Sequence, residues 1–180
     1  MSTIVFKRAE TNTELEQILE LQRINLPASL SEAEKQTEGF VTVHHNFETL
    51  KSLNDTCAHI IAVHDHKVIG YALCMDKSFR NVIPVLKPMF DKLDTILPID
   101  SSFMIMGQVC VDKDFRKQGV FRGLYQHMRS ELKSQYDQII TEVDTSNKRS
   151  LHAHLAIGFK ILYSYRSKNH DWEIVHWNLN

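Results

Sequence analysis

VCVDKDFRKQGVFRGLYQHM, residues 109–128, changes from a branched apolar run to charged residues and then to helical spacing. Val120, Leu124 and Met128 recur at every fourth position, which predicts an amphipathic helix with one face toward a core. The run before it, from residue 102 to residue 111, is almost continuously apolar, as expected of a central buried strand. Gly119 therefore stands at a predicted strand-to-helix turn, among polar and basic side chains.

This turn has the chemistry of a phosphate site. The first amides of a helix have no intrahelical acceptor and carry a partial positive charge, so phosphates bind there readily. Gly119 lets the backbone approach a ligand or turn without a Cβ penalty, and Arg116, Lys117 and Arg122 add positive charge. Neither of the common nucleotide loops, GxxxxGK[ST] and GxGxxG, is present. Taken alone, such a glycine is more often required by the turn, with solvated charges beside it.

The whole chain indicates one ordinary globular domain over residues 1–180. Its 43% hydrophobic and 24% charged residues are typical of a soluble protein, and its formal net charge of -1 gives no support to a nucleic-acid or membrane binder. The apolar runs are too short to span a membrane, and the N-terminus lacks a signal-peptide core. Cys57, Cys74 and Cys110 lack CxxC spacing, so we expect buried reduced thiols and a cytoplasmic location.

The order of elements predicts an α/β fold with a mixed sheet. The apolar and β-rich runs predict strands at 3–9, 40–45, 58–63, 67–75, 102–111, 138–143, 159–167 and 171–179. Helical spacing predicts helices at 11–26, 27–39, 46–55, 120–132 and 146–159, and an irregular helical stretch at 81–97 broken at Pro84 and Pro88. The strand–helix–strand unit around residues 104–143 predicts one parallel pair, and the hairpins on either side predict antiparallel neighbours.

At this point the residues resemble a known family. VCVDKDFRKQGVFRGLY is similar to the acetyl-CoA signature of the Gcn5-related N-acetyltransferases (GNAT), in which a strand and a short loop precede [RQ]xxGx[GA] at a helix start. Arg116 and Gly119 match, whereas Phe121 stands where the family has a small residue.

Two further stretches carry the same resemblance. EVDTSNKRSLHAHLAIGF, residues 142–159, resembles the family's second signature through Asn147, Gly158 and Phe159. The hairpin at residues 59–73 resembles the family's central meander, so the likeness extends from residue 4 to residue 179. It implies a GNAT-like three-layer fold: a mixed, mostly antiparallel central sheet with one parallel pair, flanked by helices.

The resemblance implies an acetyl-CoA-dependent N-acetyltransferase that acts on a primary amine of a small molecule, a peptide or a protein. The strand backbone at 109–111 would pair with the pantetheine arm, and amides of 117–122 would hold the pyrophosphate. The expected cofactor-binding residues are Val109, Cys110, Val111, Arg116, Lys117, Gln118, Gly119, Val120, Phe121, Arg122 and Asn147.

Two catalytic candidates follow from the second signature. Glu142, five residues before Asn147, is expected to be the general base; the alternative is a strand residue that faces solvent. His154, seven residues after Asn147, stands where many members have a tyrosine acid. The alternative is a helix-surface histidine with no chemical task, with Tyr163 or Tyr165 as the acid.

Other features predict less. The histidines at 44–45, 64, 66, 152 and 154 lack a matched second pair of ligands, so we expect no metal site. Trp172 and Trp177 could line an acceptor pocket, but at strand spacing they more often pack within a sheet. Two rival functions stay open: a non-catalytic acyl-CoA-binding or sensing module, and an α/β domain with an unrelated ligand. We expect a monomer or a homodimer.

Overall fold

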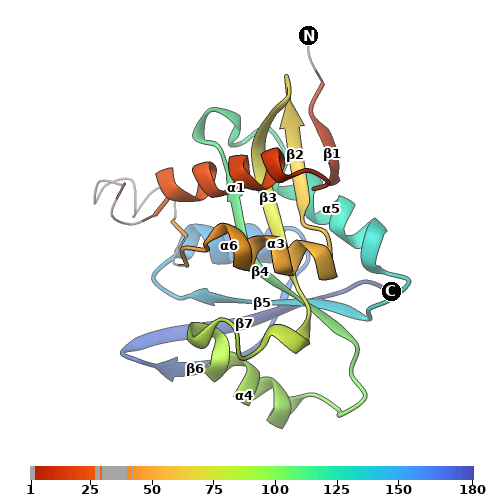
Figure 1. The fold of residues 1–180 in the computed structure, drawn as a ribbon. Coiled ribbons are helices and arrows are strands. Elements are labelled where there is room, and N and C mark those ends of the chain that lie inside the picture. The colour runs from red at the N-terminus through yellow and green to blue at the C-terminus, as the bar shows by residue number, and fades with distance from the viewer. Residues whose placement is uncertain (1–2, 27–28, 30–39, 42) are drawn as a thin grey trace. The chain divides into compact units, whose positions relative to one another are not determined.

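The structure, a computed structural model, describes residues 3–26, 29, 40–41 and 43–180. Its strands, in the order β1-β2-β3-β4-β5-β7-β6, are β1 Val5–Arg8, β2 Ile60–His64, β3 Lys67–Met75, β4 Phe103–Val111, β5 Gln138–Asp144, β7 His170–Asn178 and β6 Lys160–Ser167 (Figure 1). Its α-helices are α1 Asn12–Ile24, α3 Phe47–Thr56, α4 Lys87–Ile96, α5 Val120–Leu132 and α6 Lys148–Ala156. Short 3-10 helices are η2 Lys77–Phe79, η3 Pro84–Leu86 and η4 Lys113–Phe115.

The sheet has the predicted mixed character. The pairs β1–β2, β2–β3, β5–β7 and β6–β7 are antiparallel. The pair β4–β5 is parallel, with Phe103–Ile105 opposite Gln138–Ile140. Because parallel neighbours need a crossover, the chain between them carries α5. The predicted fold class is therefore confirmed.

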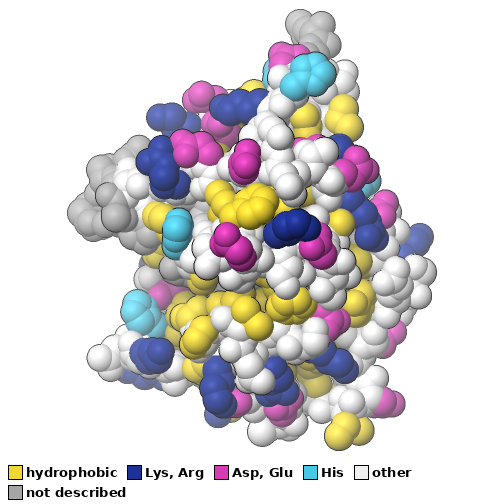
Figure 2. Space-filling view, in the orientation of Figure 1, with side chains coloured by type: hydrophobic (Ala, Val, Ile, Leu, Met, Phe, Trp, Pro, Cys, Tyr) yellow, Lys and Arg dark blue, Asp and Glu magenta, His cyan; other side chains and the backbone are white. Residues whose placement is uncertain are grey.

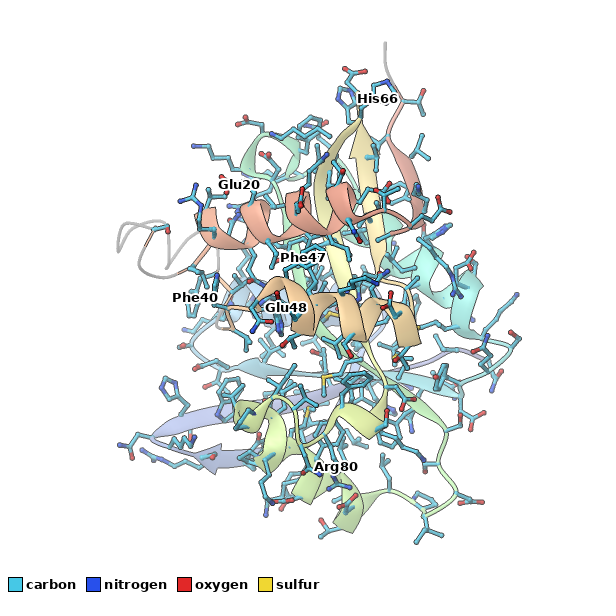
Figure 3. All side chains as sticks on the ribbon, in the orientation of Figure 1. Glu20, Phe40, Phe47, Glu48, His66 and Arg80 are labelled. Carbon is cyan, nitrogen blue, oxygen red and sulfur yellow. The ribbon has the colours of Figure 1, made fainter. Side chains whose placement is uncertain are left out.

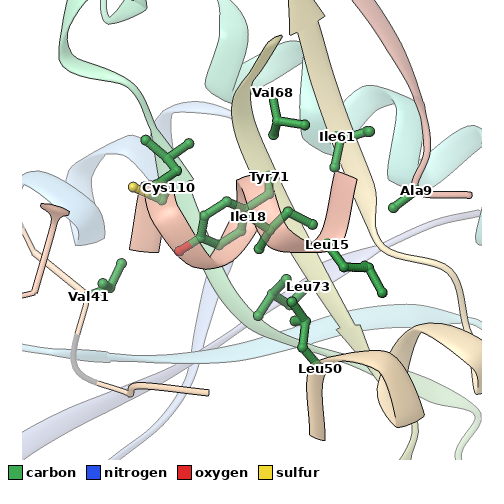
Figure 4. Packing of buried hydrophobic residues seen from close by; sticks show 11 residues of the cluster. Ala9, Leu15, Ile18, Val41, Leu50, Ile61, Val68, Tyr71, Leu73 and Cys110 are labelled. Carbon is green, nitrogen blue, oxygen red and sulfur yellow. The ribbon is translucent and has the colours of Figure 1, made fainter. Parts of the chain in front are cut away.

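The chain forms two compact units, of which the first comprises the described residues up to Cys74 together with Met106–Glu131. In this unit α1 begins with a capping box between Thr11 and Glu14. Leu15 and Ile18 of α1 pack with Tyr71 of β3 in one buried cluster, drawn in Figure 4. This cluster holds α1 on one face of the strands.

Helix α5 packs against the opposite face of the same strands. A Cβ added to Gly70 of β3 would lie 3.1 Å from Val120 and 3.3 Å from Leu124. A Cβ added to Gly123 of α5 would lie 2.1 Å from the ring of Phe6 in β1. The register places Phe6 and Gly70 on one face of the sheet, because both lie opposite Ala62. Val120 and Leu124 are buried, as the helical spacing predicts.

The second unit comprises Met75–Ile105 and Leu132–Asn180. Helix α6 packs through His154, whose ring lies edge-on to Phe159, and Phe159 contacts Trp177 of β7. Pro88 stands in the first turn of α4, and Pro84 begins η3. The stretch is irregular and partly helical, as predicted, but each proline stands in the first turn of a helix and interrupts none, because a proline is tolerated where an amide has no intrahelical acceptor.

Two predicted elements need comment. The helix predicted at 27–39 lies outside the described residues, apart from Ser29. Of the strand predicted at 40–45, the described residues 40–41 and 43–45 form no strand. Their backbone groups bind side chains instead: the Val43 carbonyl accepts a hydrogen bond from Gln108, and the His45 amide donates one to Gln22.

Surface charge follows the near-neutral balance of the sequence. On the face drawn in Figure 2, acidic and basic side chains are interspersed over α1 and α3. Among the described residues, no helix combines the length and the apolar character that a membrane crossing requires.

Three buried histidines make stability depend on pH. Burial lowers the pKa of His45, His59 and His154 from 6.5 to about 4. Between pH 6.5 and 4 these three histidines are therefore protonated in the unfolded chain and neutral in the folded one. The free energy of unfolding falls as pH falls through this window. Each shift corresponds to about 3 kcal/mol.

We expect thermal unfolding to move to lower temperature between pH 7 and pH 4.5. In His59→Gln the amide can replace both ring contacts, which join the Leu50 carbonyl and the Cys74 amide. This variant should lose part of the pH dependence, measured as the difference in free energy of unfolding between the two pH values. An equal pH dependence in both proteins would contradict the assignment of His59 as a neutral buried ring.

Candidate functional site

The loop from β4 into α5 is anchored to β3 at Asp112. The Asp112 amide donates a hydrogen bond of 2.8 Å to the Ile69 carbonyl. Its carboxylate accepts one of 3.1 Å from the amide of Asp114, within η4, and pairs at 3.1 Å with Lys67. These contacts fix the chain direction immediately after the strand ends.

Arg116 braces the same loop from within. Its Nε donates to the Val111 carbonyl over 3.1 Å, and its Nη2 donates to Oδ1 of Asn25 over 2.8 Å. The sequence predicts Arg116 as a cofactor-binding residue and one of the positive charges at the phosphate position. The structure shows that its guanidinium braces the loop through these two oxygens, and its contact with a cofactor stays a prediction.

The exposed end of the loop fits a phosphate group. Gly119 has φ of 82°, and a Cβ added there would meet nothing within 4 Å. Lys117 also has a positive φ, of 62°, and Gln118 is tied back to the Asp114 carbonyl at 2.8 Å. Because α5 begins at Val120, the first helical amides lie directly after this open glycine. Lys117, Gln118, Gly119 and Arg122 are all exposed, which leaves the helix N-terminus approachable for an anion.

The end of β4, immediately before the loop, carries no reactive side chain. Val109 and Val111 are half-buried, and Cys110 between them is 7% exposed. Burial raises the pKa of the Cys110 thiol to about 12, so it stays protonated near neutral pH and is a poor nucleophile. Cys57 and Cys74 are buried thiols as well, as the sequence predicts.

Phe121 departs from the family pattern without blocking the loop. Its ring lies 5.1 Å from that of Tyr125, one turn further along α5. The bulky side chain is thus directed along the helix toward Tyr125.

In the second unit, Glu142 and Tyr165 form a half-buried acid–phenol pair. They lie on β5 and β6, on the same face of the sheet, opposite Ile174 and Trp172 of the intervening β7. The Tyr165 hydroxyl donates a short hydrogen bond to Oε2 of Glu142. Although Glu142 was named from the sequence as a base, its partner Tyr165 was named only as a possible acid.

The pair titrates in the range that base catalysis needs. Burial raises the pKa of Glu142 to about 7, and the hydrogen bond from Tyr165 opposes this rise. Burial and the neighbouring carboxylate raise the pKa of Tyr165 above its ordinary value. Near pH 7 the pair therefore offers a carboxylate that can take a proton and a phenol that keeps its own. Glu142 is half-buried and bonded to Tyr165, which favours the base over the alternative of an ordinary solvent-facing residue, and its catalytic role stays a prediction.

His154 does not have the properties of the expected acid. It is 1% exposed, and its Nδ1–H donates over 2.7 Å to the Ser150 carbonyl. Burial lowers its pKa to about 4, so the imidazolium that the mechanism would need is scarce near pH 7. The surface-histidine alternative is also wrong, because the ring packs against Phe159. The spacing of seven residues places His154 on the same face of α6 as Asn147, but spacing alone does not show that His154 is buried.

Asn147 has a structural task at the start of α6. Its Oδ1 accepts a hydrogen bond of 3.2 Å from the Ser150 amide, so Asn147 is the N-cap of this helix. Contact between Asn147 and a cofactor stays a prediction.

The remaining candidates are dispersed. His64 ends β2, and Asp65 and His66 form the β2–β3 turn with positive φ. Figure 3 shows His66 at the hairpin tip. Within the described part of the chain, no group of three or more His, Cys, Asp or Glu side chains could hold a metal ion. Trp177 packs on Phe159, in line with the packing alternative.

The chain resembles known proteins in family and in fold. Residues 15–159 match the model of the acetyltransferase (GNAT) family. No curated protein sequence matches the chain. The ribosomal-protein-S18-alanine N-acetyltransferase of Escherichia coli has a similar structure, with a TM-score of 0.65 and 16% identity over 98% of this chain and 94% of that one.

Two plant structures are similar in the same degree. NAA60 of Arabidopsis thaliana, in complex with acetyl-CoA, has a TM-score of 0.66 and 14% identity over 98% of this chain and 99% of that one. Naa50 of Arabidopsis thaliana, in complex with the bisubstrate analogue CoA-Ac-MVNAL, has a TM-score of 0.65 and 14% identity over 97% of each chain. At these identities the likeness is one of fold.

Gly119→Val should weaken acetyl-CoA binding by at least about tenfold, because a branched side chain would occupy the open space at the helix start and resist positive φ. Titration calorimetry measures the affinity, and thermal unfolding measures the fold. Gly123→Ala is the control, since its Cβ would collide with Phe6 and should destabilise the fold. A Gly119→Val protein that binds acetyl-CoA as the wild type does would make this glycine a feature of the turn alone.

Proposed function

Because the chain belongs to the acetyltransferase (GNAT) family, we propose that it transfers an acetyl group from acetyl-CoA to a primary amine of a small molecule, a peptide or a protein. The observation that carries the proposal is the open Gly119 at the start of α5, held in position by Asp112 and Arg116. The acetyl-CoA bound to the plant relative NAA60 supports this choice of co-substrate.

In this proposal the whole of residues 1–180 is one acetyltransferase domain, and the family model extends over parts of both compact units. The amides of 117–122 would hold the pyrophosphate at the helix N-terminus, with Lys117 and Arg122 nearby as exposed charges. The backbone of Val109–Val111 would pair with the pantetheine arm, and Asn147 is retained as a cofactor contact.

Acetyl-CoA supplies a thioester: the amine nitrogen bonds to the acetyl carbon while the carbon–sulfur bond breaks and the thiolate leaves. Glu142 would take the proton that the amine loses, for which a pKa of about 7 is suited. Tyr165 would give its hydroxyl proton to the thiolate and recover a proton from Glu142 through their hydrogen bond. The protons then balance, and no other co-reactant is required.

Tyr165 is preferred over the other two acids considered from the sequence. Tyr163 is 38% exposed, and the contact of its ring is with the ammonium of Lys92 at 5.8 Å. His154 is neutral near pH 7, as its lowered pKa requires. The Glu142–Tyr165 pair also favours catalysis over the rival reading of a non-catalytic acyl-CoA-binding or sensing module, which would have no use for a base of this pKa.

The proposal also includes the cellular compartment, the class of acceptor and the oligomeric state. Buried thiols at all three cysteines are typical of a reducing compartment, and we propose the cytoplasm. The acceptor is proposed to be a small-molecule or peptide amine rather than a nucleic acid or a membrane, with the chain acting as a monomer or a homodimer.

The direct test is release of the CoA thiol from acetyl-CoA in the presence of a panel of primary amines and peptides with free amino termini. The proposal predicts amine-dependent thiol release with an equal amount of acetylated amine. Tight binding of acetyl-CoA without turnover on any acceptor would favour the binding module, and no binding would favour an unrelated ligand.

Substitutions in the pair should separate its two roles. Glu142→Gln should lower kcat/KM by roughly 100-fold, typical of a lost general base, with little change in acetyl-CoA affinity. In the wild type, kcat/KM should rise with pH through about 7, as Glu142 loses its proton. Glu142→Gln should lack this rise.

Tyr165→Phe removes the hydrogen bond that lowers the pKa of Glu142, so the rise should move to higher pH. The pH profile of kcat/KM checks this sign, with Tyr163→Phe as the matched control that leaves the pair intact. Profiles that coincide for the wild type, Glu142→Gln and Tyr165→Phe would remove the pair from the mechanism.

A further inference from the structure

Two chains of hydrogen bonds join the proposed cofactor stretch to the residues that lead into α3. We call these residues, Val41 and Val43–His45, the pre-α3 segment. The first chain begins at Arg116, which donates to Oδ1 of Asn25 over 2.8 Å. The Asn25 carbonyl accepts a hydrogen bond of 3.2 Å from the Val41 amide. One residue at the C-terminal end of α1 thus touches both the loop and the segment.

The second chain passes through two buried glutamines. Nε2 of Gln108, in β4, donates to the Val43 carbonyl over 2.8 Å. Oε1 of Gln108 accepts from Nε2 of Gln22 over 2.8 Å and from the Tyr71 hydroxyl over 2.6 Å. Oε1 of Gln22 in turn accepts from the His45 amide over 2.8 Å. Both ends of the pre-α3 segment are therefore held from α1 and β4.

These contacts define a single arrangement of each amide. Asn25 accepts through Oδ1 and donates through Nδ2 to the Leu21 carbonyl over 2.9 Å, and Gln108 uses its oxygen and its nitrogen in the same way. Gln22 is 0% exposed, so loss of a partner would leave a buried polar group unsatisfied. Because these groups are buried and bonded to one another, a shift of one side chain in the network is expected to shift the side chains bonded to it.

One chain starts immediately before the proposed cofactor stretch, residues 109–122, and the other starts within it, and both end on the pre-α3 segment. Gln108 immediately precedes Val109, and Arg116 immediately precedes the open turn at Lys117–Gly119. Since the described residues of the segment form no strand, these side chains supply hydrogen bonds that a ladder would otherwise give. All the residues concerned belong to the first compact unit.

We infer that Asn25 is a positioning residue that couples acetyl-CoA binding at the β4–α5 loop to the order of the pre-α3 segment. The inference rests on the proposed function, since it takes acetyl-CoA as the ligand of the loop. Phosphates bound after Arg116 restrict the loop, the restricted guanidinium holds Asn25, and Asn25 holds Val41. By linkage, a segment held in place strengthens cofactor binding by the same factor.

Amide hydrogen exchange measured by NMR provides the test, because the Val41 and His45 amides are themselves members of the network. Saturating acetyl-CoA should slow exchange at both amides by at least about threefold in the wild type. In Asn25→Leu, which has a similar volume and no polar atom, this effect at Val41 should disappear, and the dissociation constant of acetyl-CoA should rise at least about threefold.

Two further variants make the result specific. Asn25→Asp keeps an acceptor for Arg116 and should retain most of the coupling. Arg23→Ala changes a neighbouring α1 residue whose ion pair with Glu20 is exposed, and it should behave as the wild type (Figure 3 labels Glu20).

The outcomes distinguish this inference from the function beneath it. Wild-type protein that binds acetyl-CoA without slower exchange at Val41 and His45 would overturn the coupling alone, and this comparison decides the matter even if Asn25→Leu fails to fold. The same affinity and the same exchange response in Asn25→Leu would also overturn it. Failure of the wild type to bind acetyl-CoA would overturn both proposals.

Discussion

The turn between β4 and α5 is the constraint on which the account depends. Within a few residues the chain passes from a largely buried strand through an exposed, charged loop into a helix. The turn is made with Gly119 at φ of 82°. Asp112 ties the beginning of this turn to β3, and Arg116 ties its middle to α1. These contacts fix the shape of the loop without a ligand. In the proposed function the phosphates would therefore bind with little reorganisation, which is how preorganised sites gain affinity.

The chemistry depends on a second constraint, the burial of an acid beside a phenol. A carboxylate in water would have too low a pKa to accept a proton from an ammonium group efficiently. On the face of β5, burial raises the pKa of Glu142 to about 7, and Tyr165 limits that rise with one hydrogen bond. The neighbouring β7 sets their separation, because its pairing with both strands determines which residues share a face.

Much of the fold was predictable because its signals are local. The four-residue spacing from Val120 to Met128 predicts α5, and the Thr11–Glu14 capping box predicts the start of α1. The site was less predictable because its decisive contacts are distant in sequence. Arg116 donates a hydrogen bond to Asn25, which is 91 residues away in the sequence. Its position in the motif suggests a phosphate contact but gives no sign of this partner. Helical spacing gave the face on which His154 lies but not that this face is buried, and burial lowers its pKa, which argues against the role of a protonated acid.

The central claim is that the β4–α5 turn holds the pyrophosphate of acetyl-CoA. Titration calorimetry that compares acetyl-CoA with S-acetyl-pantetheine, which has the same thioester arm and no pyrophosphate, tests this claim most directly. The account predicts that acetyl-CoA binds far more tightly to the wild type, and that Gly119→Val removes most of this advantage while leaving the weak affinity for S-acetyl-pantetheine unchanged. Equal affinities of the wild type for the two ligands would contradict the account.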